Sequence, residues 1–445
     1  MSKIKNFLPA YLGVIFLCIK SCVPLAPTGS TTGNPSLQIT TDGIYQNKVF
    51  HENIEAVQLF RPEEPFLGAV ISIAQEKPLW LVFDILEDES SSNYDELFVK
   101  IIHCNADWRK SMLNNLDFLQ EFNEFRLNDY EFSVDTKVPY TQYRFQVPRV
   151  KMPGNYIALV YRNRNENDAL LTHRFMVYHN QVAVGANIIR SSGVKERNTH
   201  HQVEFTVDYR NYDIPNPYDG VHVVLRQNQS WYNTIEGLRP SFVREVDRLL
   251  EYRHFTLENN FPAGNEYRYF DLRLTRALGQ NVGNIDREKT PMEAFLLKDR
   301  SRLSEAYSQY EDLNGNFAIG TTDTGAGRSN LEADYVLTHF FLASEEPVNG
   351  SVYITGAFNN RVLAPENQMK YDAELQGYLG SLLLKQGFYN YQYYVESDGS
   401  TPSYYYEGSH YETENQYEIL IYHRPLGARA DLLIGYINLS SSRLN

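Results

Sequence analysis

Gly154-Asn155-Tyr156-Ile157-Ala158-Leu159-Val160-Tyr161 combines a glycine with a continuous run of apolar and aromatic residues. The glycine supplies a turn, and the aromatic residue after it begins a buried face. Short apolar runs of this length are what a β-sandwich supplies. Gly387-Phe388-Tyr389 introduces a second such run in the same way. Both stretches predict strands like those of immunoglobulin-like sandwiches.

Short runs with alternating or continuous apolar character recur along the chain, separated by Gly, Pro, Asn and Asp. The clearest are Leu67–Ile73, Leu79–Ile85, Leu97–His103, Tyr143–Val147, His173–Tyr178, Gln202–Tyr209, Tyr267–Leu274, Tyr335–Leu342, Val352–Gly356, Tyr389–Val395 and Glu418–His423. The chain also contains 33 Tyr and 24 Phe against 6 Met and 3 Trp, and aromatic residues pack well on pleated, half-buried surfaces. We therefore predict an all-β protein of tandem β-sandwich modules, of the immunoglobulin-like or E-set type.

A chain of 445 residues exceeds one compact core, so several domains are expected. The predicted segments are a lipoprotein-type signal peptide (1–22), a flexible tether (23–42), an N-terminal β-sandwich (43–180), a middle β-rich domain (181–329) and a C-terminal immunoglobulin-like β-sandwich (330–445). The last boundary follows the polar, Gly-rich region Lys298–Ser329. The tether has few large apolar residues and cannot form a core, so it would provide reach.

The N-terminus has the order of a secretory signal peptide, with lysines, the apolar stretch Phe7–Ile19 and then a small residue before a cysteine. The apolar stretch is shorter than the ~20 residues of a spanning helix. Ile19-Lys20-Ser21-Cys22 resembles the bacterial lipoprotein box, from which Lys20 departs, so Cys22 is the predicted lipid anchor. The alternative is ordinary cleavage near the same place, which leaves a soluble periplasmic protein. No acidic run follows Cys22, so we expect the protein to face the periplasm.

Charge and cysteine content exclude two classes of protein. The formal net charge is −14 and no Lys/Arg-rich stripe offsets it, so phosphate backbones are repelled and nucleic acid is excluded as a partner. The three cysteines are Cys18, Cys22 and Cys104. Once the signal is removed they can form no intramolecular disulfide framework, and Cys104 is predicted to be a small buried hydrophobic residue.

Several short motifs match catalytic or metal sites but lack the partners that the chemistry needs. Asp323-Thr324-Gly325-Ala326 matches half of an aspartic-protease site, which needs two carboxylates sharing a proton, and no second copy exists. His103 and Cys104 are adjacent on a predicted strand and point to opposite faces. His200-His201 lacks a third ligand and is interpreted as an exposed pair near a strand start. Glu311–Asn316 does not fit a calcium loop and predicts an Asx-type turn. We therefore expect no catalytic residue, no metal and no cofactor.

The longest informative stretches are polar and aromatic. They are His103-Cys104-Asn105-Ala106-Asp107-Trp108, Asp129-Tyr130-Glu131-Phe132-Ser133, Tyr140-Thr141-Gln142-Tyr143-Arg144-Phe145, Gln227-Asn228-Gln229-Ser230-Trp231, Gly264-Asn265-Glu266-Tyr267-Arg268-Tyr269-Phe270-Asp271 and Leu384-Lys385-Gln386-Gly387-Phe388-Tyr389-Asn390-Tyr391-Gln392-Tyr393. In this order, from about Phe60 to the C-terminus, the chain resembles the plug protein family of the type IX secretion system of Bacteroidetes. The motif residues, whose role the resemblance leaves open, are His103, Asn105, Asp107, Trp108, Asn228, Trp231, Asn265, Glu266, Asp271, Lys385, Gln386 and Gly387.

The resemblance implies a role in protein transport across the outer membrane. In that family a large translocon barrel exports proteins, and the plug protein occupies its periplasmic mouth when no substrate is engaged. By resemblance, this chain is expected to be a non-enzymatic plug or accessory subunit that closes the pore sterically. Its expected partners are the outer-membrane barrel protein and, through the N-terminal lipid, the membrane. Its expected place is the periplasmic face of the outer membrane, or the periplasm.

A second resemblance lies in the C-terminal segment. Val352–Asn360, Met369–Asp372 and the Lys-Gln-Gly-Phe-Tyr strand resemble glycogen-binding-type carbohydrate modules with an immunoglobulin-like fold. Those modules commonly place a Trp after the Phe-Asn pair as a platform for sugar rings, and here Arg361 occupies that place. The alternative function is a periplasmic glycan-binding outer-membrane lipoprotein, in which Tyr371 would contact the sugar. A shared fold alone does not carry that function.

Overall fold

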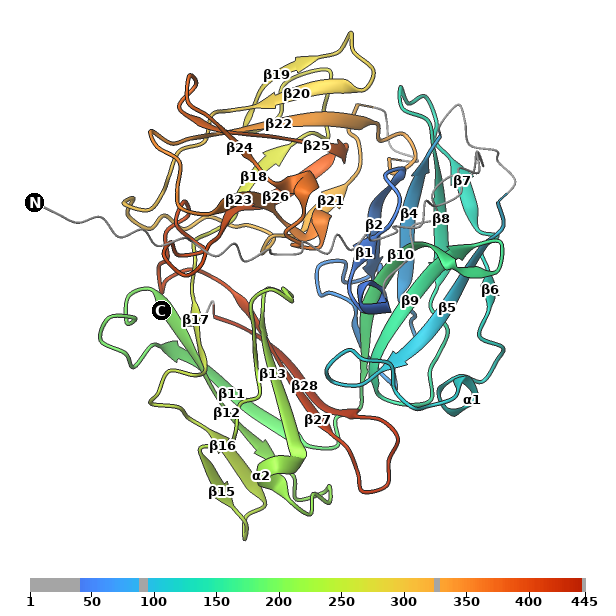
Figure 1. Ribbon diagram of the computed structural model, residues 1–445, viewed down its shortest axis with the longest axis vertical. Helices are drawn as coiled ribbons and strands as arrows, with labels where there is room; N and C mark the ends of the chain where they lie inside the picture. Colours follow the sequence, from blue (N-terminus) through green and yellow to red (C-terminus); the bar gives the residue numbers. More distant parts are fainter. Residues whose placement is uncertain (1–40, 88–94, 324–328, 442–445) are drawn as a thin grey trace, which may run out of the picture. The chain divides into compact units, whose positions relative to one another are not determined.

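The computed structural model describes residues 41–87, 95–323 and 329–441, and all of them belong to one compact unit, Gln38–Asn445. The predicted signal peptide, the predicted lipid anchor Cys22 and residues 23–40 of the predicted tether lie outside the described residues. Within them, nearly all regular structure is β-strand, arranged in stacked, mostly antiparallel sheets (Figure 1). The prediction of an all-β protein made of tandem sandwiches is confirmed.

The first sandwich packs two sheets around one apolar core. One sheet has the strand order β1-β10-β9-β5-β6, with β3 paired to β10, and the other has the order β2-β4-β8-β7. The strands are β1 (Lys48–Val49), β2 (Ile54–Phe60), β3 (Val70–Ser72), β4 (Trp80–Leu86), β5 (Leu97–Cys104), β6 (Phe125–Arg126), β7 (Tyr130–Phe132), β8 (Tyr140–Gln146), β9 (Gly154–Arg162) and β10 (Asn165–Tyr178).

Strand β9 is buried on both faces, which explains its continuous run of apolar residues. Tyr156 and Val160 belong to the core between the two sheets. On the opposite face, Ile157 packs in a cluster that includes residues of the middle sandwich, and Leu159 packs with Phe50. A strand that is covered on both faces needs apolar residues at every position instead of at alternate ones.

The last two strands of the chain complete the middle sandwich. One of its sheets has the order β11-β12-β16-β15, with β17 paired to β12, and the other has the order β14-β13-β27-β28. The strands are β11 (Ala183–Arg190), β12 (His200–Asp208), β13 (Val221–Gln227), β14 (Thr234–Glu236), β15 (Phe242–Arg244), β16 (Leu249–Tyr252), β17 (Asn260–Pro262), β27 (Gln416–His423) and β28 (Leu432–Ser440). In Figure 1 the red strands β27 and β28 lie beside the green strand β13, and Val221 is in register with His423.

The third sandwich lies between β17 and β27 in the sequence. One sheet has the order β18-β26-β21, with β23 paired to β26, and the other has the order β19-β20-β22-β25-β24. The strands are β18 (Arg268–Asp271), β19 (Val282–Asp286), β20 (Met292–Leu296), β21 (Phe317–Ile319), β22 (Tyr335–Ala343), β23 (Ser351–Thr355), β24 (Lys370–Asp372), β25 (Gly377–Lys385) and β26 (Gly387–Glu396). Its core is rich in buried aromatic residues from both sheets.

Sheet membership groups the chain differently from the contiguous segments 181–329 and 330–445. The boundary at 329/330 falls inside the third sandwich, where β20 pairs with β22 and β21 pairs with β26. Strands β27 and β28 lie in segment 330–445, yet β27 pairs with β13 of the middle sandwich. Local apolar runs show where strands are, but a ladder can join strands from any distance in the sequence, so the runs do not reveal the partners.

Helices are few and short in the described part of the chain. They are η1 (Thr41–Tyr45), α1 (Asn115–Phe118), α2 (Pro217–Gly220), η2 (Ala357–Asn359) and η3 (Pro365–Asn367). None of the helices described is long and apolar enough to span a membrane.

Candidate functional site

The motif residues do not converge on one cleft but lie at or near places where two sandwiches meet. The first group joins the first and third sandwiches and consists of Lys385, Gln386 and Gly387. The second joins the first and middle sandwiches and consists of His103, Asn105, Asp107, Trp108, Asn228 and Trp231. The third consists of Asn265 and Glu266, on the connection from the middle to the third sandwich, and Asp271, at the end of β18 in the third sandwich.

Lys385 and Asp84 form a buried ion pair where β25 of the third sandwich meets β4 of the first. The Lys385 Nζ lies 2.5 Å from the Asp84 Oδ2, and neither side chain is accessible to solvent. Asp84 also accepts hydrogen bonds from the Tyr335 hydroxyl (2.7 Å) and the Gln142 amide (3.1 Å). The Tyr140 ring centroid lies 3.9 Å from the Lys385 Nζ. Burial lowers the pKa of Lys385, against the opposing effect of Asp84. We call this arrangement the Asp84–Lys385 joint.

One further carboxyl belongs to this joint. Glu55 on β2 is in register with Asp84 on β4, so the two acidic residues are cross-strand neighbours. Burial raises the pKa of Glu55 to about 8, and the negative charge of Asp84 acts in the same direction. At neutral pH this pKa favours the protonated form of Glu55, which adds no second negative charge beside the Asp84–Lys385 pair.

Gln386, the next motif residue, binds the carboxylate of Asp323, which is the aspartate of the protease-like motif. Its amide donates to the Asp323 Oδ2 (2.9 Å). Thr275 donates to the same oxygen from its backbone N–H (2.8 Å) and its hydroxyl (2.7 Å), and the Arg276 N–H donates to Oδ1 (3.1 Å). Burial acts to raise the pKa of Asp323, but these hydrogen bonds outweigh it and the pKa is lowered. Asp323 is therefore a hydrogen-bond acceptor that joins several segments, while Thr324, Gly325 and Ala326 of the motif lie outside the described residues.

Gly387 allows two strands to approach closely. A Cβ atom at this position would lie 2.6 Å from the backbone oxygen of Ala318 on β21. Any larger residue would push β21 away from β26 and disturb the strand that follows Lys385. The glycine is therefore required by packing beside the Asp84–Lys385 joint.

Trp108 and Trp231 meet across the boundary between the first and middle sandwiches. Their ring centroids are 4.9 Å apart and the rings are nearly perpendicular. The Arg174 guanidinium lies 4.3 Å from the Trp108 ring and 5.0 Å from the Trp231 ring, and the Arg226 guanidinium lies 4.4 Å from the Trp231 ring. Arg226 is paired with the buried Glu418 at 2.6 Å. Burial lowers the pKa of Arg174 to about 10, and the Arg226 charge adds to this shift. We call this arrangement the Trp108–Trp231 joint.

A tight turn after β5 presents Trp108 to this joint. The Trp108 N–H donates to the Asn105 carbonyl (2.9 Å), and Trp108 has the left-handed φ of 63°. The Asn105 side chain accepts a hydrogen bond from the Asp431 N–H (3.2 Å), which ties the turn to the middle sandwich. Asp107 accepts from the Arg109 N–H (3.0 Å) and faces solvent. These motif residues therefore shape and fasten the turn.

His103 and Cys104 do not form a reactive pair. The His103 ring packs edge-on against Tyr156, and its Nδ1 lies 3.0 Å from the Ser111 hydroxyl. Burial lowers the pKa of His103 to about 4 and raises the pKa of Cys104 to about 12, so both are neutral at physiological pH. Cys104 packs in the apolar cluster between the first and middle sandwiches, and the prediction of a buried cysteine is confirmed.

The asparagines of the motifs complete backbone hydrogen bonds. Asn228 donates to the Asn415 side chain (2.7 Å) and accepts from the Gln416 N–H (2.8 Å), which fixes the start of β27 beside the end of β13. Asn265 donates to the Glu407 carbonyl (2.9 Å) on the connection between the third and middle sandwiches. Both side chains therefore join segments that are distant in the sequence.

Glu266 and Asp271 differ in environment. Glu266 is almost fully buried, and its carboxylate accepts a hydrogen bond from the Tyr307 hydroxyl (2.5 Å). Burial raises the pKa of Glu266 to about 7, while the hydrogen bond from Tyr307 opposes the shift. Asp271 forms a surface ion pair with Arg273 at 2.6 Å. The neighbouring carboxyls of Asp312 and Glu414 add to the upward shift of the Glu266 pKa.

A recess opens beside the Trp108–Trp231 joint, and we call it the tryptophan–arginine recess. It has a smaller inner part of about 100 Å³ and a larger outer part of about 360 Å³, which share Trp108, Trp231 and Arg174 as lining residues. Arg226 and Arg361 line the inner part only. Asp107 and Glu236 line the outer part only. The recess is therefore a place where motif residues and arginine side chains line open space.

The histidine pair and the oxygen-rich loop are structural. The prediction that His200-His201 is exposed is wrong for His201, because its two ring nitrogens contact the Tyr417 hydroxyl (2.8 Å) and the Tyr411 carbonyl (2.6 Å) in the interior. The Asp312 side chain accepts from the Asn314 N–H (2.6 Å), which forms the predicted Asx-type turn. Over residues 41–87, 95–323 and 329–441, no group of three His, Cys, Asp or Glu side chains is placed to hold a metal ion.

The site of the sugar platform is closed in this chain. Arg361 is 8% exposed and donates to the Asn314 carbonyl (3.0 Å). Phe358 packs edge-on against the buried Tyr389 ring. The Tyr371 hydroxyl donates to a backbone carbonyl (2.7 Å). Arg361 and Phe358 thus have partners within the protein, whereas Tyr371 is partly exposed.

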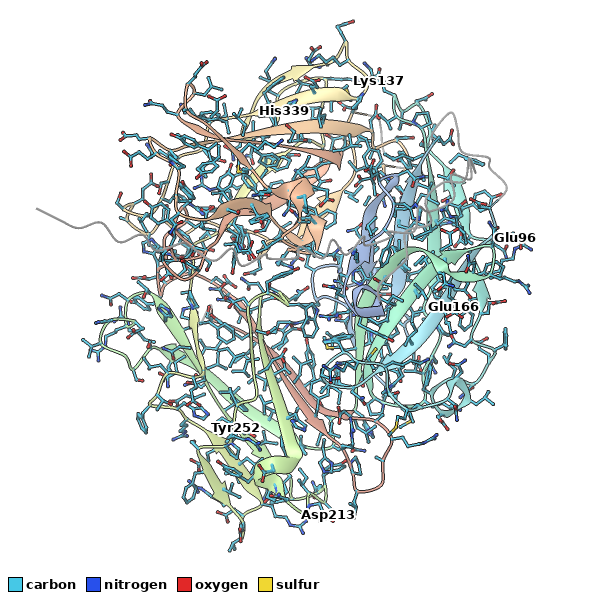
Figure 2. The ribbon with its side chains drawn as sticks, in the orientation of Figure 1. Glu96, Lys137, Glu166, Asp213, Tyr252 and His339 are labelled. Atoms are coloured by element: carbon cyan, nitrogen blue, oxygen red, sulfur yellow. The ribbon has the colours of Figure 1, made fainter. Side chains whose placement is uncertain are left out.

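Sequence reasoning did not single out Asp84, Arg174, Arg226 or Glu418. One signal was present, because Asp84 interrupts the apolar run Trp80–Leu86, and a charge inside a buried strand requires a partner. The identity of that partner depends on how the sandwiches pack. Lys137, labelled in Figure 2, illustrates the same packing: its backbone N–H lies in the first sandwich and donates to a side-chain oxygen of Asp334 (2.8 Å) in the third.

Comparison with known proteins places the chain in a family. A family model described as the type 9 secretion system plug protein 1st domain matches residues 54–179. A crystal structure of a hypothetical protein from Parabacteroides merdae is 30% identical, with a TM-score of 0.83 over 89% of this chain and 99% of that one. No curated protein sequence matches. Residues 54–179, which form most of the first sandwich, therefore belong to the family described as the type 9 secretion system plug protein 1st domain.

Proposed function

We propose that this protein is a plug or accessory subunit of the type IX secretion translocon that closes the periplasmic mouth of the outer-membrane pore sterically. A protein that closes a pore sterically needs no catalytic residue and no cofactor, but its domains must be rigidly connected. The observation that carries the proposal is the Asp84–Lys385 joint, because an inaccessible ion pair fastens two sandwiches to each other.

The joints between sandwiches support this role. At the Asp84–Lys385 joint each charged atom has polar partners, and breaking it would expose an unpaired buried charge. At the boundary with the middle sandwich, the Tyr422 hydroxyl donates to Asn155 of β9 (2.8 Å), within an apolar cluster that both sandwiches share. Sandwiches linked in this way behave as one block rather than as beads on a string.

A lipid anchor at Cys22 and a tether over 23–42 are part of the same proposal. Acyl chains on Cys22 would hold the protein at the periplasmic face of the outer membrane. The tether would then keep the folded body close to the barrel, so that a modest affinity gives high occupancy through effective concentration. Mass spectrometry of the mature N-terminus tests the anchor directly, and an unmodified N-terminus that lacks Cys22 contradicts it.

The proposed function predicts physical association with the translocon barrel. Purification of the native barrel through a tag should recover this chain in stoichiometric amount. Deletion of its gene should make the outer membrane permeable to large solutes that are normally excluded, and complementation should restore the barrier. A purification that recovers the intact barrel without this chain, or an unchanged barrier in the deletion strain, would sink the proposal.

An exposed aromatic residue offers a way to locate the contact with the barrel. Phe132 is 58% exposed on the edge strand β7 of the first sandwich, within the region that the family model matches. Phe242 is 59% exposed on the edge strand β15 of the middle sandwich and is a matched control. Exposed aromatic residues are frequent anchors of interfaces. We expect Phe132→Ser to reduce the recovery of this chain with the barrel and Phe242→Ser to leave it unchanged, whereas equal recovery would move the contact elsewhere.

A further inference from the structure

The tryptophan–arginine recess contains buried hydrogen-bond donors that the fold does not use. Trp108 is 5% exposed and its indole N–H has no acceptor among the described residues. Arg361 is 8% exposed, and its Nε–H likewise has no acceptor within the described part of the chain. Buried donors without acceptors are uncommon in folded proteins. Both residues line the inner part of the recess, so an acceptor that reaches the two N–H groups there would satisfy them.

The inner part is also positively charged. The Arg174 Nε donates to the Tyr45 carbonyl (2.8 Å), and no carboxylate of the described residues forms an ion pair with Arg174 or Arg361. The charge of Arg226 is balanced by Glu418. No Asp or Glu is found among the described residues that line the inner part. Glu236 of the outer part attracts the Arg174 charge, so an anion that enters the inner part meets one guanidinium without an ion-pair partner among the described residues, that of Arg361, and no carboxylate.

The outer part has the opposite charge. Its acidic residues are Asp107 and Glu236. Asp107 lies 3.8 Å from the exposed Arg109 side chain. Glu236 forms no ion pair in the described part of the chain, although its charge acts on Arg174. A second negative charge on the ligand would be repelled at this point, whereas an ammonium group would be attracted.

Taken together, we propose that the recess binds a small zwitterion of the amino-acid class, with its carboxylate in the inner part and its ammonium group toward Glu236. Two oxygens of a carboxylate can accept from the Arg361 Nε–H and the Trp108 indole N–H, and guanidinium groups match the planar carboxylate. The outer part, about 360 Å³, is in the size range of small-molecule sites. The Trp108 and Trp231 rings supply apolar surface for a side chain.

The charge pattern separates this ligand from other anions. Inorganic phosphate carries more negative charge and has no ammonium group, so the carboxylates of the outer part disfavour it. An amino-acid amide has the ammonium group but no carboxylate, so it leaves the buried donors unsatisfied. The expected order of affinity is the free amino acid first, then phosphate and the amide.

The intact protein provides its own reporter, because Trp108 and Trp231 are two of its 3 tryptophans. The common free L-amino acids are titrated one at a time, and the change in tryptophan fluorescence is followed and checked by calorimetry. The best ligand is then compared with its amide and with inorganic phosphate. We expect saturable binding for at least one amino acid, and at least a tenfold weaker affinity for its amide and for phosphate.

A matched pair of variants tests the site. Arg361→Met removes one of the unused donors and should weaken the binding of that amino acid at least tenfold. Arg300→Met changes an arginine of the same sandwich whose side chain is 80% exposed and paired with Glu305, and it should bind like the wild type. Circular dichroism of both variants confirms that they are folded.

The proposal is overturned if no free amino acid binds saturably, if the amide or phosphate binds as tightly as the acid, or if Arg361→Met binds like Arg300→Met. These results would leave steric closure of the pore untouched, because that role depends on the bulk of the protein and not on the recess. Conversely, failure to co-purify with the barrel would not affect binding to the recess.

Discussion

The first sandwich meets its two neighbours through joints of opposite character. At the Asp84–Lys385 joint the charged atoms are inaccessible and have partners from both sandwiches. At the Trp108–Trp231 joint the arginines stack on indole rings, and two residues with unsatisfied buried donors line an open recess. A closed, fully satisfied polar network makes a structure rigid, whereas unsatisfied buried donors are costly. We therefore expect the first joint to contribute more to stability than the second.

Removing the lysine of the closed joint should have the largest effect. Lys385→Met leaves Asp84 buried without a counter-ion, and breaking a buried pair costs ~3–5 kcal/mol. The free energy of unfolding, measured by urea denaturation, should fall by that amount. Lys289→Met is the control, because the Lys289–Glu293 pair at 2.7 Å is on the surface and contributes at most about 1 kcal/mol. Equal effects of the two substitutions would contradict the assignment of the joint.

Removing one hydroxyl of the same joint should have an intermediate effect. Tyr335→Phe deletes a hydrogen bond to the buried Asp84 carboxylate, and such bonds contribute about 1.5–3 kcal/mol. Tyr252, labelled in Figure 2, is equally buried, but its hydroxyl has no partner among the described residues. Tyr252→Phe should therefore leave the free energy of unfolding unchanged or raise it slightly. A larger loss of stability from Tyr252→Phe than from Tyr335→Phe, in thermal or urea unfolding, would contradict this prediction.

The pH dependence of the free energy of unfolding should reflect the ionisation of Glu55. Its pKa is about 8 in the folded protein, whereas an unfolded glutamate ionises near 4.5. Between these values unfolding releases a proton, so the free energy of unfolding falls as the pH rises, by up to about 1.4 kcal/mol per pH unit. Glu55→Gln should remove this decline. Urea denaturation at several pH values between about 5 and 8 tests it, and parallel profiles for both proteins would argue against a protonated Glu55.

The smallest effect is expected at the open joint. Arg361→Met removes a long basic side chain, as Lys385→Met does, but it leaves no carboxylate without a partner. One hydrogen bond to the Asn314 carbonyl is lost and a buried charge disappears, so the change in the free energy of unfolding should stay within about 1 kcal/mol. A loss comparable to that of Lys385→Met, measured in the same urea experiment, would show that the recess is as structural as the closed joint.

Local features of the sequence were sufficient for the fold class. Tyr156–Tyr161 predicted a strand because apolar side chains crowd it, and β9 is indeed buried on both faces. The same features could not show that β27 pairs with β13, since a ladder between distant strands leaves no local mark. They also could not show that Trp108 and Trp231 meet, or that Asp84 faces Lys385, because these contacts exist only after three sandwiches have packed.

The return of β27 and β28 to the middle sandwich affects how the chain can be made and cut. Synthesis runs from the N-terminus, so the last two strands of the middle sandwich are made only after all strands of the third sandwich. A premature stop after Glu396 would spare every strand of the third sandwich and still leave β13 with one unpaired edge. Exposed edges promote aggregation. Short truncations at the C-terminus should thus yield insoluble protein, in spite of how little of the chain they remove.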